Sequence, residues 1–185
     1  KNFADAVNLT DGAGAKSHMS ALATAAILAQ NSIEPVLQFT TRDRNRIAIQ
    51  GDLLGGWALN IPNILCLYGD EVKGGDQPET KEVRDLDTLS LLKTAHDIKI
   101  KKTYPSGRKI QDAPEFFIGG ADTPSPIKDN FDGANIIKKI NAGVEFFQTQ
   151  YAFDEEVLKN YMLKLDELGI TEKAYFIVGL GVIKS

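Results

Sequence analysis

The feature that most constrains the fold of this chain is a regular alternation of short apolar runs and longer amphipathic runs. The short runs, rich in Val, Ile, Leu and Phe, indicate buried β-strands, and the longer ones have helical spacing. Such alternation predicts an α/β fold with a parallel sheet and right-handed crossovers. We predict strands at residues 6–9, 35–39, 63–68, 115–118, 145–149 and 174–178, and helices at residues 17–31, 44–59, 87–98, 133–141 and 155–168.

The ends of these helices carry recognisable signals. Ser17 and Asp154 stand where an N-cap side chain accepts hydrogen bonds from unpaired amides. Gly143 and Gly169 follow two helices at the position where a left-handed residue is often needed. These signals predict helix boundaries and say nothing about chemistry.

Each predicted strand ends in small or polar residues. In parallel α/β folds, ligands bind at the carboxyl ends of the strands. The small or polar residues at any one strand end (a strand tip) are explained by the turn that begins there. Six such strand tips together favour a shared binding site. The tips are Thr10-Asp11-Gly12, Thr40-Thr41, Gly69-Asp70, Gly119-Gly120, Thr149-Gln150 and Gly179.

Two connections exceed the usual loop length. Residues 69–85 are rich in Gly, Asp, Glu and Lys and directly follow a strand tip, so we expect an active-site loop. Residues 99–114 precede a strand and are expected on the opposite rim, away from the site. The run Gly12-Ala13-Gly14-Ala15 permits close approach of a ligand, but it lacks the dinucleotide fingerprint.

Composition excludes several classes of protein. The net charge of −4 argues against a nucleic-acid sheath and a polybasic membrane contact. The single cysteine, Cys66, suits a reducing cytoplasm and excludes an intramolecular disulfide. His18 and His96 lack ligand partners at metal-binding spacing, so we expect no metal site. No apolar run reaches the length of a membrane helix, and no secretory leader is visible.

Three groups of polar residues are candidates for binding. Asp70 and Gln150 at strand tips either cap neighbouring turns or face a common mouth, where they would suit a ring with adjacent N–H and oxo groups. Asp132, Asn135 and Lys139, with Lys138 beside them, form a polar helix stripe. This stripe is either a solvated face or a cationic site for a diphosphate.

Taken together, the motifs resemble methylenetetrahydrofolate reductases over the whole chain. The resemblance implies a flavin-containing (β/α)8 TIM barrel, with this chain spanning strands two to seven. On this reading, residues 1–185 form a single barrel domain of about six strand–helix units, lacking the first and last strands. The motifs are Val7-Asn8-Leu9-Thr10-Asp11-Gly12, Leu67-Tyr68-Gly69-Asp70, Lys138-Lys139-Ile140-Asn141-Ala142-Gly143 and Thr149-Gln150-Tyr151-Ala152-Phe153-Asp154.

The resemblance also assigns roles to residues. It implies that Asp70 and Gln150 bind the pterin ring of a folate and that Asp70 is catalytic. Asp11, Gln38 and Tyr68 stand where better-known members carry Tyr, His and Arg. The residues implied to bind FAD are Thr10, Asp11, Gln38, Tyr68, Gly69, Asp70 and Gly119 around the flavin, and Asp132, Asn135, Lys138 and Lys139 around the remainder.

The implied reaction has two half-reactions. NADH or NADPH reduces FAD, and the reduced flavin then passes hydride to methylenetetrahydrofolate, giving methyltetrahydrofolate. The family's general acid, a Glu on the first strand, and an Arg near the last strand have no counterparts here. An alternative is therefore a catalytically degenerate flavin- or folate-binding subunit of an electron-transfer complex. A third hypothesis is another barrel enzyme with a phosphorylated substrate. We expect a cytoplasmic protein that forms a homo-oligomer or belongs to a larger complex.

Overall fold

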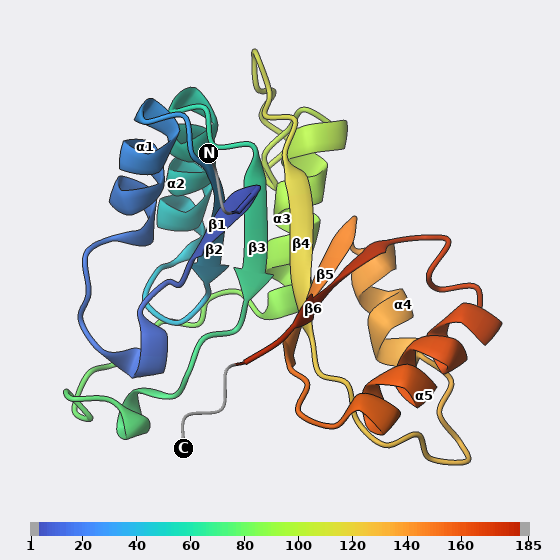
Figure 1. The fold of residues 1–185 in the computed structure, drawn as a ribbon. Helices are drawn as coiled ribbons and strands as arrows, with labels where there is room; N and C mark the ends of the chain where they lie inside the picture. The colour runs from blue at the N-terminus through green and yellow to red at the C-terminus, as the bar shows by residue number, and fades with distance from the viewer. Residues whose placement is uncertain (1–3, 182–185) are drawn as a thin grey trace. The chain divides into compact units, whose positions relative to one another are not determined.

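The structure is a computed structural model that describes residues 4–181. It divides into two compact units, Lys1–Ile118 (unit 1) and Gly119–Ser185 (unit 2), and each is described by itself (Figure 1). The elements of unit 1 are β1 (Ala6–Leu9), α1 (Ala21–Gln30), β2 (Glu34–Thr40), α2 (Arg46–Ala58), β3 (Asn63–Leu67) and α3 (Thr88–Ile100). The elements that follow are β4 (Phe117–Asp122), α4 (Ala134–Asn141), β5 (Phe146–Tyr151), α5 (Glu155–Glu167) and β6 (Tyr175–Gly179).

The strand order confirms the predicted fold class. The strands follow the order of the chain, β1-β2-β3-β4-β5-β6, with helices between them. The pairs β1–β2, β2–β3, β4–β5 and β5–β6 are all parallel. Parallel strands added one after another with helical crossovers are the pattern of a (β/α)8 barrel, here incomplete.

The core of unit 1 forms around β2. Leu37 and Phe39 on this strand are each only 1% exposed, because helices cover the sheet. Ile49 and Leu53, one helical turn apart on α2, are fully buried beneath it. Figure 1 shows α1 and α2 side by side against these strands. The apolar stripe of α2 is therefore part of the core of unit 1.

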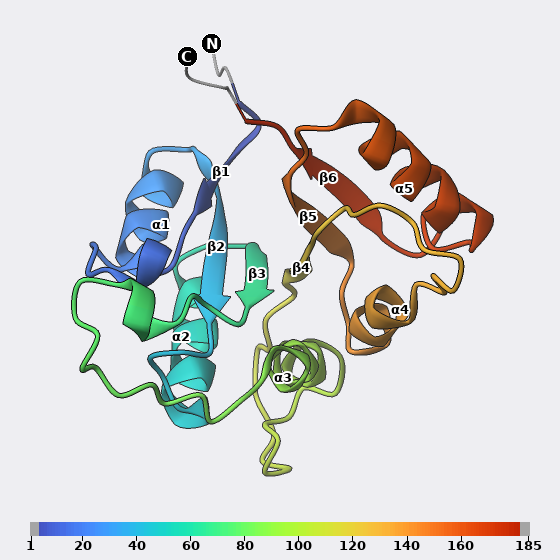
Figure 2. The ribbon, with the colours of Figure 1, turned by 90° about the horizontal axis from the view of Figure 1, so that it is seen from below.

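Unit 2 has its own core. Ile136 of α4, Leu165 of α5 and Phe147 of β5 are buried, and both helices lie on one side of β5 and β6 (Figure 2). Phe147 also stacks on Phe176, with ring centroids 5.1 Å apart. Such stacked pairs add to the apolar burial that holds neighbouring strands together.

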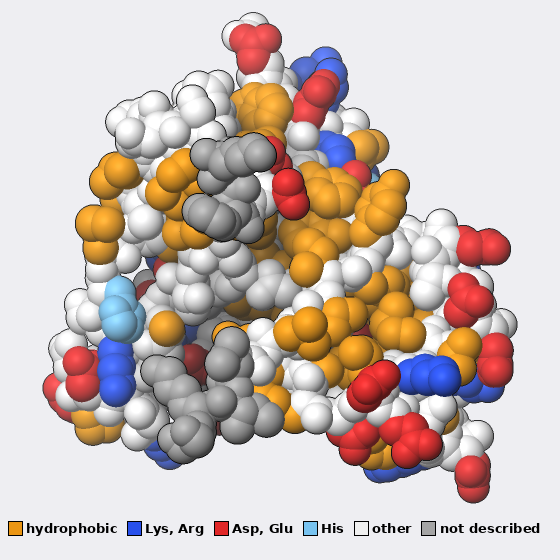
Figure 3. Space-filling view, viewed as in Figure 1, with side chains coloured by type: hydrophobic (Ala, Val, Ile, Leu, Met, Phe, Trp, Pro, Cys, Tyr) orange, Lys and Arg blue, Asp and Glu red, His pale blue; other side chains and the backbone are white. Residues whose placement is uncertain are grey.

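One face of β6 is apolar and exposed. Tyr175 and Ile177 on β6 are 74% and 51% exposed, and Leu180, directly after the strand, is 75% exposed. Apolar side chains gather over this strand in Figure 3. Exposed apolar patches on soluble domains often mark contacts with further protein surface. None of the helices in residues 4–181 has the length and apolar composition that crossing a lipid bilayer requires.

Most predicted helix ends are confirmed, and one is wrong. Asp154 caps α5 by accepting from the amides of Glu156 and Val157, each at 3.0 Å. Gly143 and Gly169 adopt φ of 110° and 63° after α4 and α5, as expected. The cap of α1 is Ser20 and not Ser17, because a 3-10 turn at Ala13–Ala15 and extended backbone at Lys16 delay the helix.

The fourth strand is also displaced from its predicted position. Gly119 and Gly120 lie inside β4 and are buried, so they do not form its tip. A Cβ on Gly120 would lie 3.1 Å from Val144 Cγ2, which explains why glycine occurs within a strand. The true tip is Asp122-Thr123, where a carboxylate replaces the expected glycines.

A glycine in α2 allows a test of helix stability. Gly51 lies inside α2, and a Cβ built there meets no atom within 4 Å. We predict that Gly51→Ala raises the free energy of unfolding by about 0.5–1 kcal/mol, because alanine restricts the unfolded backbone and favours helix. Urea denaturation measures this change. An unchanged or lowered stability would contradict the open environment seen at this position.

Candidate functional site

The carboxyl ends of β1, β2 and β3 meet at one edge of unit 1. The parallel registers place Leu9 beside Leu37 and Thr40 beside Leu67. Thr10 follows β1 directly and is exposed at this edge. The predicted clustering of the first three strand tips is therefore confirmed.

Asp11 ties the end of β1 to the end of β2. Its Oδ2 accepts from the Thr40 backbone amide at 2.9 Å and from Thr40 Oγ1 at 3.0 Å. Arg44 forms an ion pair with the same carboxylate. Because its oxygen is occupied by these donors, Asp11 fixes the strand edge in this structure and shapes the site indirectly.

Arg42 lies between the loops that follow β1 and β3 at this edge. Its side chain is only 4% exposed and donates to Gly12 O at 3.3 Å and to Asp70 O at 3.2 Å. Asp43 receives two further hydrogen bonds at 2.8 Å each. The hydrogen bond to Asp43 raises the pKa of Arg42, so the guanidinium remains charged. One buried cation thus joins the loops after β1 and β3.

Gly69 is required by backbone conformation and by space. Its φ is 87°, and a Cβ there would lie 2.9 Å from Thr40 Cβ. Side chains rarely adopt this φ, and the close approach leaves them no room. The glycine lets the chain turn sharply after β3 and places Asp70 at the edge.

Asp70 serves first as a turn cap in this structure. Its Oδ2 accepts from the Gly14 amide at 2.8 Å, which orders the glycine-rich turn after β1. The side chain is otherwise exposed at the common edge. The capping role expected from the sequence is therefore confirmed, while a ligand-binding role for Asp70 stays a prediction.

Tyr68 and Arg84 form the base of the loop at residues 69–85. The Arg84 guanidinium lies 3.7 Å from the centroid of the Tyr68 ring and donates to Tyr68 O at 2.8 Å. It also pairs with Glu82. Gln38 differs from these residues, since it is buried within β2 and donates to Asn8 Oδ1 at 3.2 Å.

The pairing of Glu82 gives a pH-dependent prediction. Hydrogen bonds from Arg84 and the Val72 amide lower the pKa of Glu82 to about 2, from an ordinary value of 4.5. A carboxylate whose pKa is lower in the folded state stabilises the fold at pH values above its ordinary pKa. This stabilisation is lost as the pH falls from the ordinary pKa to the folded-state pKa. We expect the Tm difference between the native protein and Arg84→Met to shrink from about pH 4.5 to about pH 2.

The comparison with Arg84→Met isolates this pair. Asp85, whose pKa is also lowered to about 2 by Arg46, titrates in both proteins and cancels in the difference. Thermal unfolding followed by circular dichroism gives both Tm values. A difference that stays constant across the window would show that Glu82 and Arg84 do not interact.

Unit 2 contains a cavity of about 380 Å³ between the β4–α4 connection and α5. Asp132 and Asn135 line it, and Gly133, with φ of 67°, opens α4 between them. Asp132 lies before the helix, where its Oδ1 accepts from the Ala134 amide at 2.9 Å. Two of the four predicted polar residues of this segment thus share one cavity.

The two lysines of α4 behave differently. Lys138 is exposed, whereas Lys139 is half-buried and donates to Ala121 O. Burial lowers the pKa of Lys139. Lys139 therefore anchors α4 to β4 in this structure, and only Lys138 presents an exposed ammonium group.

Asp122 and Tyr161 are cavity residues that the sequence interpretation missed. Tyr161 Oη donates to Asp122 Oδ2 at 2.7 Å, and burial raises the pKa of this phenol. The carboxylate stands at the true tip of β4. Tyr161 lies within the helix predicted at residues 155–168, and no motif linked it to Asp122.

Gln150 and Gly119 also belong to unit 2. Gln150 is exposed near the end of β5, as predicted, and its backbone oxygen accepts from Thr149 Oγ1 at 2.9 Å. Gly119 is buried in β4, away from the tip assigned to it. Whether Gln150, Thr10 and Asp70 share one ligand stays a prediction.

A comparison with known protein families covers nearly the whole chain. Residues 1–184 match the family model described as methylenetetrahydrofolate reductase. The chain belongs to the methylenetetrahydrofolate reductase family. Methylenetetrahydrofolate reductases are folate-related oxidoreductases and are generally flavin-dependent, so the resemblance drawn from the motifs is confirmed at family level. A comparison with curated proteins found no match.

Proposed function

We propose that the protein is an FAD-dependent oxidoreductase that reduces 5,10-methylenetetrahydrofolate to 5-methyltetrahydrofolate. The family match over residues 1–184 carries this proposal. NADH or NADPH is the proposed electron donor. Bound FAD supplies the hydride chemistry, and the protein binds and orients the reactants. We further propose a cytoplasmic protein, and the exposed face of β6 supports assembly into an oligomer or a larger complex.

The described residues fit FAD in two places. The cavity of unit 2 is lined by the Asn135 amide and the Asp132 carboxylate, and the exposed Lys138 ammonium follows on α4 outside the cavity lining. An amide and a carboxylate suit ribose and adenine groups, and an ammonium suits a diphosphate. The other place is the β1–β3 edge, where the sharp turn at Gly69 brings the exposed Asp70 to the strand ends.

Asp70 provides the electrostatic part of the proposed reaction. The reactive form of the folate is a cationic iminium, and a nearby carboxylate lowers the energy of developing positive charge. The hydrogen bond from Gly14 holds the carboxylate in place before the substrate arrives. Fixed charges of this kind act without reorganisation during the reaction. Gln150 is proposed to orient the pterin ring through its amide.

Titration with FAD tests the cofactor assignment directly. We expect Asn135→Ala to weaken FAD binding about tenfold, as the loss of a hydrogen bond to a polar ligand does. Asn141→Ala is the matched control, because Asn141 is exposed at the other end of α4. Quenching of flavin fluorescence reports the Kd. Equal affinity in both variants would remove the unit 2 cavity from the proposed FAD site.

A further inference from the structure

Unit 1 contains a cavity of its own, between α2 and the loop that follows α3. Residues 102–110 form a small hairpin closed by the Thr103–Lys109 bridge, with Gly107 N donating to Tyr104 O at 2.8 Å. The predicted peripheral loop at residues 99–114 thus contains an ordered hairpin. It stands over α2 and encloses a cavity of about 650 Å³, within the usual range for small-molecule sites.

The charges around this cavity favour an anion. Of the residues that the structure describes, two arginines, Arg46 and Arg108, line it and no acidic residue does. Arg46 is neutralised by Asp85 at 2.7 Å. Among residues 4–181, no carboxylate forms an ion pair with Arg108, which lies over the Tyr104 ring at 4.1 Å. The stacked guanidinium is held in place while its N–H groups stay available to a ligand.

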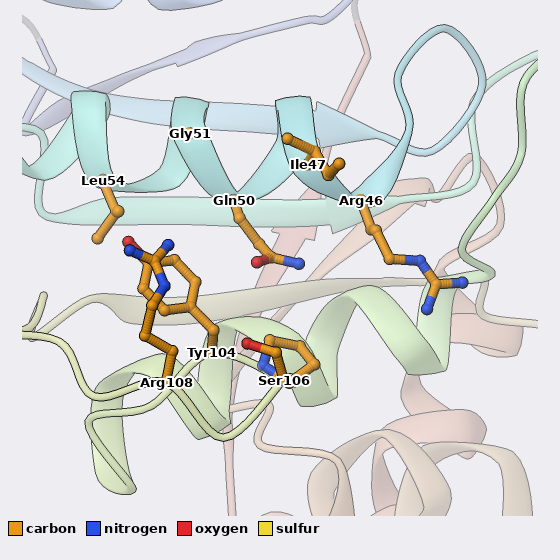
Figure 4. A pocket seen from close by; sticks show the side chains of 9 residues that line it. Arg46, Ile47, Gln50, Gly51, Leu54, Tyr104, Ser106 and Arg108 are labelled. Atoms are coloured by element: carbon orange, nitrogen blue, oxygen red, sulfur yellow. The ribbon is translucent and has the colours of Figure 1, made fainter.

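The remaining lining suits a flat apolar group beside the anion. Gly51 lies on the α2 wall without a side chain, and Leu54 follows it. A Cβ at Gly51 would meet no atom within 4 Å beyond its own stretch of helix, so the space over the helix backbone is open. Figure 4 shows Gln50 and Arg46 extending from α2 toward the hairpin, where Tyr104, Ser106 and Arg108 face them. Ser106 and Gln50 add donors near Arg108.

We propose that this cavity binds a small organic phosphate that carries a flat ring. The phosphate takes hydrogen bonds from Arg108, with Ser106 and Gln50 as further donors, because a phosphate offers more acceptor oxygens than a carboxylate. The ring lies over Gly51 and against Leu54 and the Tyr104 side of the hairpin. This site is separate from the residues of the proposed FAD site and does not depend on that assignment.

Protein NMR with phenyl phosphate as the probe tests the proposal. We expect phenyl phosphate to cause saturable shifts of the Gly51, Ser106 and Gly107 amides. Benzyl alcohol, which lacks the charge, and inorganic phosphate, which lacks the ring, are expected to bind more weakly. Arg108→Gln is expected to weaken phenyl phosphate binding about tenfold. Gly51→Phe, which fills the space over α2, is expected to abolish it.

Lys109→Gln is the matched control, because Lys109 is the neighbouring exposed cation on the same hairpin and does not line the cavity. Its affinity should stay within about twofold of the native protein. Absence of saturable shifts at Gly51 and Ser106 would overturn the proposal. The proposal would also be overturned if Arg108→Gln bound phenyl phosphate as well as the native protein does. The same holds if benzyl alcohol or inorganic phosphate bound as tightly as phenyl phosphate, or if the shifts were confined to Gly133 and Asn135 in unit 2.

Discussion

Replacement of Asp70 by Asn is expected to lower kcat for methylenetetrahydrofolate reduction about 100-fold, with little change in FAD affinity. The amide oxygen of Asn can still accept from Gly14, whose amide now donates to Asp70 Oδ2 at 2.8 Å. The turn after β1 therefore keeps its cap, and only the negative charge is lost. Steady-state kinetics of methyltetrahydrofolate formation measures the change.

A second variant in the same loop separates local charge from overall charge. Asp76→Asn removes an exposed carboxylate from residues 69–85 and should leave kcat nearly unchanged. If Asp70→Asn retained full kcat while Gly14 kept its hydrogen bond, Asp70 would be a structural cap only. That result would remove the one catalytic assignment made within this chain.

Arg42→Met is expected to lower the free energy of unfolding by about 3 kcal/mol. Its guanidinium is buried and donates to Gly12 O and Asp70 O, so its removal breaks the side-chain link between the two loops. Gly12 O still accepts from the Ala15 amide at 3.0 Å, and Asp70 O still accepts from Arg84 at 3.4 Å. Asp43 is 46% exposed and can be hydrated, which limits the loss. Urea denaturation gives the value.

Arg46→Met is the control for Arg42→Met. The Arg46 side chain is 54% exposed and pairs with Asp85, so its removal should cost less than about 1 kcal/mol. A similar loss in both variants would mean that burial of Arg42 contributes nothing beyond a surface ion pair. A near-zero loss for Arg42→Met would contradict its role in joining the loops after β1 and β3.

The alternation of strands and helices was predictable because each element has its own apolar period. β1 and the two C-terminal glycine signals, Gly143 and Gly169, are local features that tertiary packing did not override. The fourth strand was placed too early, since glycine is a turn signal in sequence but a packing requirement at Gly120. Packing against Val144 depends on a distant part of the chain and leaves no local signal.

The candidate site was predictable at its strand tips and not in its supports. Thr10 directly follows β1, and Asp70 comes shortly after the end of β3, so the sheet sets their positions. Arg42 acts through backbone carbonyls of Gly12 and Asp70, and no residue pattern marks such contacts. Lys139 belonged to a polar stripe by helical spacing, yet its ammonium folds back to Ala121 O. Long side chains decide such contacts only after the helix has docked.

The most direct test of the central claim is an anaerobic half-reaction. The FAD-loaded protein is reduced chemically and mixed with 5,10-methylenetetrahydrofolate, while absorbance of the oxidised flavin and formation of 5-methyltetrahydrofolate are followed together. We expect the oxidised flavin absorbance to return with one equivalent of product for each flavin. Flavin that stays reduced, with no methyl product, would contradict the proposed reaction and favour a binding or electron-transfer role.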